Sequence, residues 1–273
     1  MSTSESDIEE LLDLAEAALD DGDPYHAIGL CEQITALVPS HPGALFLAAE
    51  AYRELREFES AEACYRAILK QDSNHSPSWS GLGAVLFDTL RFDECLSPLL
   101  RAIRIDPANP VAYYWRAMLR ERTEDWDGAA RDYHRAAIID PYSFPRPAPL
   151  DDAAIEAIVS EALTQLPDSL QHYLSEVSIL LEELPDETVL VQYEPPMPPG
   201  DLLGYYTGVP IAERTSDNPW SNLPSAIVLY RRNLQRIAAD REILIDELRT
   251  TVFHELGHFL GLTEEDLEER GLD

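Results

Sequence analysis

The sequence is poor in features that would cross a membrane, form disulfide bonds or bind phosphate. No stretch of 18 or more apolar residues occurs, so a membrane-spanning helix is not expected. The three cysteines are too few and odd in number for a disulfide framework. Only 20 basic residues stand against 51 acidic ones, and the net charge of −31 would repel nucleic acid. The N-terminal residues lack the apolar core of a secretory signal, so we expect a cytoplasmic protein.

The chain is long enough and apolar enough for two globular domains. It has 273 residues, of which 45% are hydrophobic, and a mean hydropathy of −0.23. These values are typical of soluble folded proteins. The acidic excess runs through both halves of this acidic protein. It could steer basic partners or substrates, but we interpret it first as a source of solubility.

A pattern with a period of 34 residues runs through the first half of the chain. Each period repeats a helix-ending residue, a small residue, a mid-sized or aromatic residue and a large apolar residue. The four series are Pro39, Ser73, Pro107 and Pro141; Ala27, Ala61, Cys95 and Ala129; Cys31, Tyr65, Leu99 and Tyr133; and Leu11, Leu45, Trp79 and Tyr113. Small residues let two helices approach closely, and proline cannot continue a helix. The period therefore predicts helix-turn-helix units at 8–41, 42–75, 76–109 and 110–143.

This pattern resembles the tetratricopeptide repeat (TPR). The residues that carry the resemblance are Trp79, Leu82, Gly83, Ala129, Tyr133, Ala136 and Pro141. Ser73 and Cys95 depart from the usual proline and alanine. The resemblance implies an all-α superhelix at 8–143 whose concave face binds a peptide or a partner protein.

A proline-rich segment follows the repeats and predicts a stiff linker at 144–150 and a second domain at 151–273. Hydrophobic patterning predicts the elements of that domain. They are helices at 151–163, 167–172 and 241–260, and strands at 177–181, 188–193, 202–206 and 226–230. This mixture predicts a small α+β fold.

The long helix at 241–260 carries His254, Glu255 and His258. The histidines are four positions apart, so their imidazoles lie on one helix face and can bind one tetrahedral ion. Glu255 is rotated by about 100° and is suited to contact a water molecule instead. We therefore predict a zinc site, open to other divalent metals, with Glu255 as the general base.

Residues around this motif agree with a buried helix that ends beside the metal. Its opposite face should pack on the sheet and consists of Leu248, Val252, Leu256 and Phe259. Gly257 leaves room for a substrate or a strand, and Gly261 should end the helix and turn the chain back.

The third ligand is expected among the acids after Gly261. Glu264 occupies the place of the third histidine in the pattern His-Glu-x-x-His-x-x-Gly-x-x-His. Glu265 and Asp266 are the alternatives. A glutamate on a later helix, as some zincins use, would not fit in the residues that follow His258.

Three segments of the second half resemble the minimal zincins, a group of short zinc metallopeptidases. The segments are 202–214, 224–230 and 248–261, and the resemblance spans 155–272. It implies a compact α+β fold with a His-His-carboxylate site and no particular substrate. The stretch 182–193 is longer than the usual connection, and the fused repeats are an addition.

Together these features predict a zinc metallopeptidase whose TPR domain recruits a peptide or protein substrate. The developing oxyanion needs a stabiliser, for which Tyr206, Tyr230, Arg214 and Tyr205 are candidates. The strand at 226–230 is expected to pair with an extended substrate.

Two other functions are compatible with the same motif. One is a non-catalytic TPR binding protein whose metal site is structural and closed by four protein ligands. The other is a metal hydrolase that acts on a bond other than the peptide bond.

Overall fold

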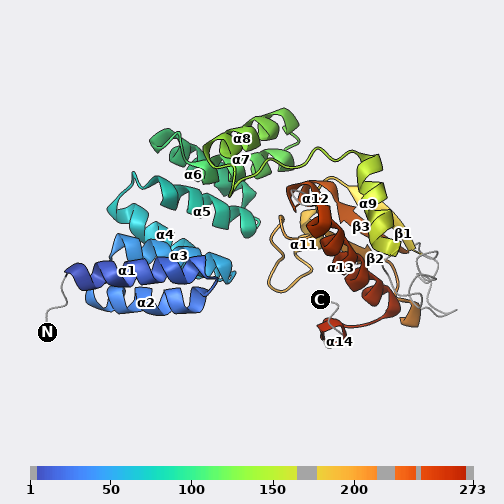
Figure 1. Cartoon of the computed structure of the whole chain (residues 1–273), viewed down its shortest axis with the longest axis horizontal. Helices are drawn as coiled ribbons and strands as arrows, with labels where there is room; N and C mark the ends of the chain where they lie inside the picture. The colour runs from blue at the N-terminus through green and yellow to red at the C-terminus, as the bar shows by residue number, and fades with distance from the viewer. Residues whose placement is uncertain (1–4, 165–176, 214–224, 238–240, 269–273) are drawn as a thin grey trace. The chain divides into compact units, whose positions relative to one another are not determined.

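The protein divides into two compact units, Met1–Phe144 and Pro145–Asp273 (Figure 1). The computed structural model describes residues 5–164, 177–213, 225–237 and 241–268. Each unit has a hydrophobic core of its own. Among the described residues, no helix combines the length and the apolarity that crossing a membrane requires.

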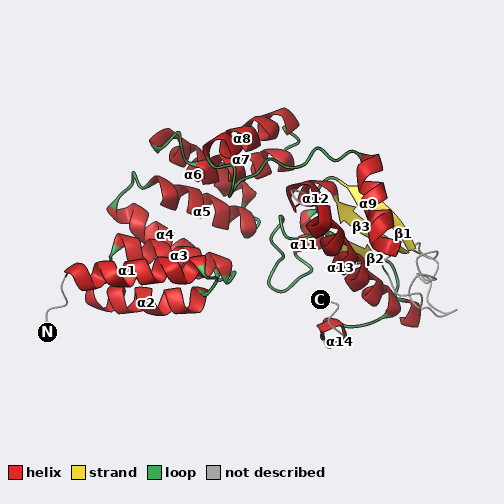
Figure 2. Ribbon diagram, in the orientation of Figure 1, coloured by secondary structure: helices red, strands yellow, loops and turns green. Residues whose placement is uncertain are grey.

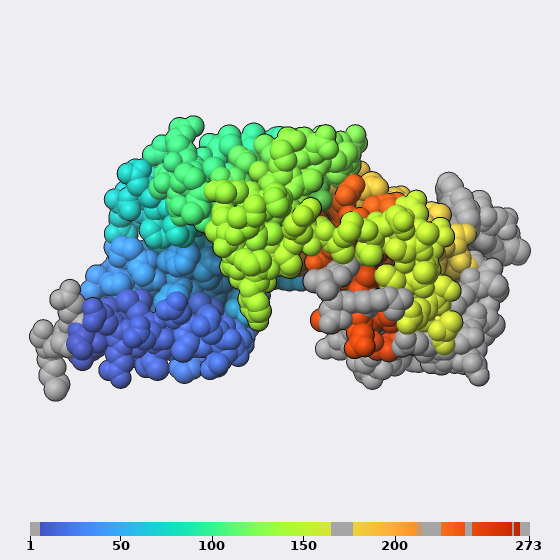
Figure 3. All heavy atoms as spheres, turned by 45° about the horizontal axis from the view of Figure 1, so that its top comes forward, coloured from blue at the N-terminus to red at the C-terminus, as the bar shows by residue number. Residues whose placement is uncertain are grey.

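The first unit is a series of helical hairpins, which confirms the predicted TPR-like fold. The hairpins are formed by α1 (Glu5–Asp20) and α2 (Pro24–Leu37), α3 (Pro42–Glu54) and α4 (Phe58–Gln71), α5 (Ser76–Asp88) and α6 (Phe92–Ile105), and α7 (Pro110–Arg122) and α8 (Trp126–Ile139). Successive hairpins pack side by side as a continuous array (Figure 3).

The small residues of the repeat are buried where neighbouring helices meet, as predicted. Ala27, Ala61 and Cys95 are fully buried and Ala129 is 2% exposed. A Cβ atom added at Gly81 would lie 2.3 Å from the ring of Tyr65. The large residue of one position therefore fills the space that a missing side chain leaves at another.

The turn inside each hairpin contains a residue with a left-handed backbone. These residues are Gly22, Arg56, Leu90 and Glu124, with φ of 73°, 59°, 61° and 58°. They recur with the same period as the repeat. Three of the four are not glycine, so the periodic glycine that would have revealed the turn is missing from the sequence.

The second unit combines a mixed sheet with helices (Figure 2), which confirms the predicted α+β class. Its elements are α9 (Asp152–Thr164), β1 (Val177–Glu182), α11 (Glu187–Leu190), β2 (Gly204–Thr207), the 3-10 turn η2 (Ile211–Glu213), β3 (Ser225–Tyr230), α12 (Arg231–Ile237), α13 (Arg241–Leu260) and α14 (Glu264–Glu268). The described strands lie in the order β1-β3-β2. β1 is parallel to β3, and β2 is antiparallel to it.

The core of this unit lies between the sheet and the helices α9 and α13. Ile155 and Val159 of α9, Ile227 and Leu229 of β3, and Leu248 of α13 belong to one buried cluster. Burying apolar side chains in this way contributes about 25 cal/mol per Å². The cluster therefore holds α13 against one face of the sheet.

One predicted strand and one predicted helix need comment. The strand predicted at 188–193 is wrong, because this stretch begins with the short helix α11. Asp186 precedes α11, and its Oδ1 accepts hydrogen bonds from the backbone nitrogen and Oγ1 of Thr188 at 2.8 and 2.7 Å. This cap overrides the strand propensity of the β-branched residues. The helix predicted at 167–172 lies outside the described residues.

The proline-rich segment after the repeats is attached to the second unit. The backbone nitrogen of Ala148 donates to the carbonyl oxygen of Gln235 at 2.8 Å. The side-chain Nε2 of Gln235 donates to the carbonyl oxygen of Leu150 at 3.0 Å. Asp151 then begins α9 by accepting a hydrogen bond from Ala154.

Candidate metal centre

The helix α13 carries the His-Glu-x-x-His motif and is anchored by its opposite face. The four residues predicted to pack on the sheet are between 0% and 1% exposed; they are Leu248, Val252, Leu256 and Phe259. This confirms the predicted buried stripe. Because this stripe is fixed in the core, His254 and His258 are held on a half-buried side of the helix.

The two imidazoles lie side by side with their outer nitrogens together. The Nε2 atoms of His254 and His258 are 3.0 Å apart, and the ring planes meet at 79°. A tetrahedral zinc ion with Zn–N bonds of about 2.0–2.1 Å separates two such nitrogens by roughly 3.3 Å. The pair therefore fits a shared metal ion with only a small adjustment.

A backbone carbonyl supports the second of these rings. The Nδ1 atom of His258 lies 3.3 Å from the carbonyl oxygen of Leu262. With the proton on Nδ1, this contact is a hydrogen bond that leaves Nε2 as the acceptor for a metal. Histidines that bind metals usually donate their other nitrogen in this way.

The turn after α13 positions the carbonyl group of Leu262. Gly261 has a φ of 89°, as a helix-ending glycine should, and confirms the prediction made for it. The backbone nitrogens of Gly261 and Leu262 donate to the carbonyl oxygens of His258 and Gly257, both at 3.0 Å. This is the Schellman arrangement of helix ends.

The space beside Gly257 is filled by a side chain of the protein itself. The prediction that Gly257 leaves room for a substrate or a strand is wrong, because Leu267 of α14 fills the space. A Cβ atom at Gly257 would lie 2.3 Å from the Cδ2 atom of Leu267. Leu267 is fully buried, so this contact docks α14 onto α13.

The side chain of Glu255 is hydrogen-bonded to the strand β2. Glu255 is 5% exposed, and its Oε2 accepts a hydrogen bond from the backbone nitrogen of Tyr206 at 2.5 Å. Tyr206 lies in β2, an outer strand of the described sheet. The carboxylate is therefore oriented by a backbone group that no sequence motif marks.

The acids that follow Gly261 are on or beside α14. The backbone of Glu264 begins α14, and its side chain lies outside the described part of the structure. Glu265 is exposed. The Oδ2 atom of Asp266 accepts hydrogen bonds from the backbone nitrogen and Oγ1 of Thr263 at 3.0 and 2.8 Å. Asp266 thus takes part in a capping box, which the Thr-x-x-Asp spacing could have revealed.

No group of three His, Cys, Asp or Glu side chains suited to a metal occurs among the described residues. The described part of the centre consists of the two imidazoles and the neighbouring carboxylate.

The four candidate oxyanion stabilisers have different positions. Tyr206 faces α13, with its ring 6.0 Å from that of Phe259. Tyr230 follows Leu229, which faces α13, so strand alternation puts Tyr230 on the other face of the sheet. There it stacks on Tyr205 at 6.1 Å. The structure therefore does not bring Tyr205 and Tyr230 to the motif, and Arg214 lies outside the described residues.

Tyr230 is fully buried in this position. Burial, followed by the nearby Tyr205 and Glu182, raises the pKa of the Tyr230 phenol above its usual range. The side chain therefore stays protonated.

The strand at 226–230 cannot receive a substrate as a further strand. This prediction is wrong, because β3 is the central strand of the described sheet and pairs on both sides. Tyr230 pairs with Glu182 of β1, and Leu229 pairs with Gly204 of β2. An apolar strand that is buried on both faces, as β3 is, is typical of this central position.

Comparison with protein families finds a match in each half of the chain. Residues 174–272 match the zincin-like metallopeptidase family, and residues 18–86 match the tetratricopeptide repeat. The fusion of the two that the motifs predicted is thereby confirmed. The zincin-like family implies a peptidase or hydrolase with a metal, usually zinc, and the repeat implies binding to other proteins.

One curated protein and two solved structures are among those to which this chain is similar. The anaphase-promoting complex subunit 3 of Schizosaccharomyces pombe is 30% identical over 104 residues, which are 38% of this chain and 16% of that protein. A thermophilic TPR protein of Thermus thermophilus is 19% identical, with a TM-score of 0.46, covering 62% of this chain and 96% of that one. The first TPR of Spaghetti, solved with an HSP90 peptide, is 19% identical, with a TM-score of 0.41, covering 46% and 97%.

Proposed function

We propose that this protein is a zinc-dependent metallopeptidase whose TPR-like unit recruits the peptide or protein that is cleaved. The observation that carries the proposal is the pair of Nε2 atoms 3.0 Å apart, next to a buried carboxylate on the same helix. The match to the zincin-like metallopeptidase family at residues 174–272 supports it.

In this proposal His254 and His258 hold the metal together with a carboxylate that follows Gly261. Glu264 is the proposed third ligand, since it stands where the related motif has its third histidine. Glu265 is the alternative, and Asp266 is less suited because its carboxylate caps α14. When bound, zinc would polarise the scissile carbonyl and lower the pKa of a water molecule to about 7.

Glu255 is the proposed general base. It takes a proton from the attacking water and delivers it to the leaving amine. The backbone nitrogen of Tyr206 keeps the carboxylate in one orientation during both transfers. Of the two outer strands described, β2 is the one that contacts Glu255, so a peptide that reaches Glu255 would run beside β2.

The TPR-like unit has a pocket that could receive a partner. This pocket lies on the first helices of the hairpins. The pocket of about 320 Å³ is lined by residues of α3 and α5, among them Phe46, Arg53 and Ser80, and by the start of α7 with its N-cap Asn109. Shallow surfaces formed by stacked repeats are commonly used to bind extended peptides. We propose that this pocket lies on the recruiting surface.

The peptidase reaction can be tested with Glu255→Gln and a matched control, Glu247→Gln. Glu247 is an exposed acid on the same helix, two turns earlier. Zinc-loaded wild type and both variants are incubated with a proteome-derived peptide library, and new peptide ends are identified by mass spectrometry. We expect wild type and Glu247→Gln to produce the same cleavages and Glu255→Gln to lose at least about 100-fold in rate. Full activity of Glu255→Gln would contradict the mechanism.

The metal itself needs a separate measurement. Wild type should bind one zinc ion, His258→Ala should lose it, and His134→Ala, an exposed histidine of α8, should keep it. X-ray absorption then counts the donors. Three protein donors and one water oxygen support catalysis, whereas four protein donors support the alternative of a TPR binding protein with a structural metal.

A further inference from the structure

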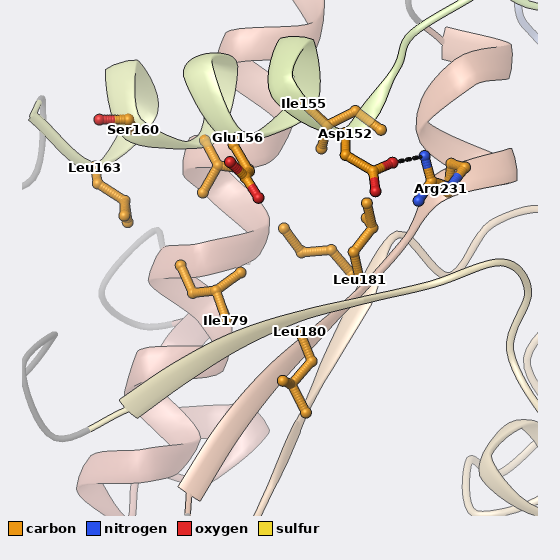
Figure 4. Close-up of a pocket in the computed structure, with 11 residues that line it drawn as sticks. Asp152, Ile155, Glu156, Ser160, Leu163, Ile179, Leu180, Leu181 and Arg231 are labelled. Carbon is orange, nitrogen blue, oxygen red and sulfur yellow. Dashed lines mark hydrogen bonds and ion pairs between the residues drawn. The ribbon is translucent and has the colours of Figure 1, made fainter.

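A groove of about 380 Å³ runs between α9 and β1, away from the histidine motif. One helical stripe of α9, which includes Ile155, Val159 and Leu163, forms one wall. Ile179 and Leu181 of β1 point toward this stripe (Figure 4). The interior of the groove is therefore largely apolar.

The other feature of the groove is the open side of β1. Val177–Glu182 pairs with β3 along its whole length, and no other strand of the described sheet lies beside it. Within the described part of the chain, no backbone hydrogen bond joins these six residues to anything except β3. An outer strand of this kind presents unpaired N–H and C=O groups.

The sequence of β1 does not protect this edge. Proteins usually blunt an outer strand with lysine, proline or a bulge. Val-Ser-Ile-Leu-Leu-Glu contains neither lysine nor proline, and its register with β3 is unbroken over all six pairs. Leu180, which points away from α9 (Figure 4), is 48% exposed. The edge is thus suited to receive another strand.

The charges at the groove favour a basic occupant. Asp152 and Glu156 of α9 line it, and Glu182 ends β1. The cation in its lining, Arg231, is bound by Asp152 and by Glu183, the latter at 2.8 Å. Glu156 is exposed and makes no ion pair with any described residue. The charge left at the rim is therefore negative.

We infer that this groove binds an extended segment of another protein, with alternating apolar and basic residues, as an additional strand on β1. Apolar side chains on one face of the segment enter the groove beside Ile179 and Leu181. Lysine or arginine side chains on the other face of the segment meet Glu182, which strand alternation puts on the side of β1 away from α9. Six residues of β1 accommodate a segment of about 20 Å. This is binding at the opposite edge of the described sheet from β2, and it does not require that the motif hydrolyses peptides.

The test uses the full chain with Glu255→Gln, so that the probe is not cut. The probe is a dye-labelled hexapeptide, Val-Lys-Val-Lys-Val-Lys, and binding is followed by fluorescence anisotropy. We expect saturable binding that Glu182→Lys weakens at least about fivefold, because it reverses the charge on the face of β1 that the lysines of the probe share. Ser160→Trp, which fills the groove from the exposed face of α9, should weaken it at least about tenfold. Glu247→Lys makes the same charge change on α13, outside the groove, and should change binding less than about twofold.

Peptide variants separate strand addition from mere charge attraction. Two probes are made, each methylated on a different set of alternate backbone nitrogens. In one probe the methyl groups replace the N–H donors that face β1, and in the other these donors stay intact. We expect one methylated probe to bind and the other to fail. Equal binding of both, equal effects of Glu182→Lys and Glu247→Lys, or no binding of the probe would overturn the proposal. Dodecanoate bound in the groove in place of the peptide would also overturn it.

Discussion

At the scale of single residues, Gly257 has the strongest steric requirement in the candidate metal centre. Its missing side chain leaves the space into which Leu267 fits, and α14 carries the proposed third ligand. Any side chain at position 257 must therefore displace the Cδ2 end of Leu267, the buried side chain that docks α14 onto α13.

We expect Gly257→Ala to lower the free energy of unfolding by about 1–3 kcal/mol and to weaken zinc binding. Affinity is measured by competition with a coloured chelator. Gly29→Ala in α2 is the control, since a Cβ atom there meets nothing within 4 Å. The double variant Gly257→Ala, Leu267→Ala should recover part of the zinc affinity, because the two side chains no longer collide. An unchanged affinity in Gly257→Ala would contradict the expectation that the contact between Gly257 and Leu267 positions the metal ligands.

Tyr230 provides a second test at this scale. Its hydroxyl is buried and has no hydrogen-bond partner among the described residues. Burying such a group without a partner costs about 1–3 kcal/mol. We expect Tyr230→Phe to leave the free energy of unfolding unchanged or to raise it by about 1 kcal/mol, measured by urea unfolding.

The matched control for this change is Tyr65→Phe in the repeats. Tyr65 is fully buried, and its hydroxyl donates to a carboxylate oxygen of Glu50. Removing that hydroxyl takes from Glu50 one of its two partners and leaves the ion pair with Arg53 at 3.0 Å, so a loss of about 1–3 kcal/mol is expected. A similar loss in Tyr230→Phe would mean that the Tyr230 hydroxyl is bound.

At the scale of secondary structure, the turns inside the hairpins contain the least favourable backbone. Arg56, Leu90 and Glu124 have the left-handed conformation that Gly22 adopts without strain. This conformation costs roughly 1–2 kcal/mol for a residue with a side chain.

Glu124→Gly should therefore raise the free energy of unfolding by up to about 1 kcal/mol. Glu124 is exposed, so few contacts are lost with its side chain. Glu124→Ala removes the same charge without relieving the backbone and should give no such gain. Thermal unfolding of the two variants beside wild type decides the question, and equal melting temperatures for both would contradict the explanation.

At the scale of the whole molecule, the two units have cores of their own, and the candidate metal centre lies in the second unit. The motif and its supporting turn belong entirely to Pro145–Asp273. A ligand stabilises only the part whose folding creates its site, by about 2.7 kcal/mol when its concentration is 100 times the dissociation constant.

We therefore expect zinc to stabilise the second unit and a chelator such as EDTA to reverse this. Hydrogen exchange with mass spectrometry, with and without zinc, reports the two units separately. Protection should increase in α13 and α14 and stay constant in α1–α8. Calcium at the same concentration is the control, since two imidazoles are poor ligands for it. Equal gains in both units would show that the metal acts elsewhere.

Much of this protein is determined by local sequence patterns. The period of 34 residues predicts the helical hairpins, because small and large residues at constant spacing decide how neighbouring helices pack. The spacing of His254 and His258 likewise places two imidazoles on one helix face. Gly261 predicts the turn that follows, since few other residues adopt its backbone. These features depend on residues close together in the chain.

The surroundings of these helices and histidines depend on tertiary structure alone. Tyr206 and Glu255 are 49 positions apart, and their hydrogen bond depends on which strand lies beside α13. The same holds for the central position of β3, the burial of Tyr230 on the far face and the open edge of β1. Strand order and register arise from long-range pairing and burial, for which a single sequence contains only weak signals. Local periodicity therefore determined the helices and the two histidines, whereas packing between distant segments determined what surrounds them.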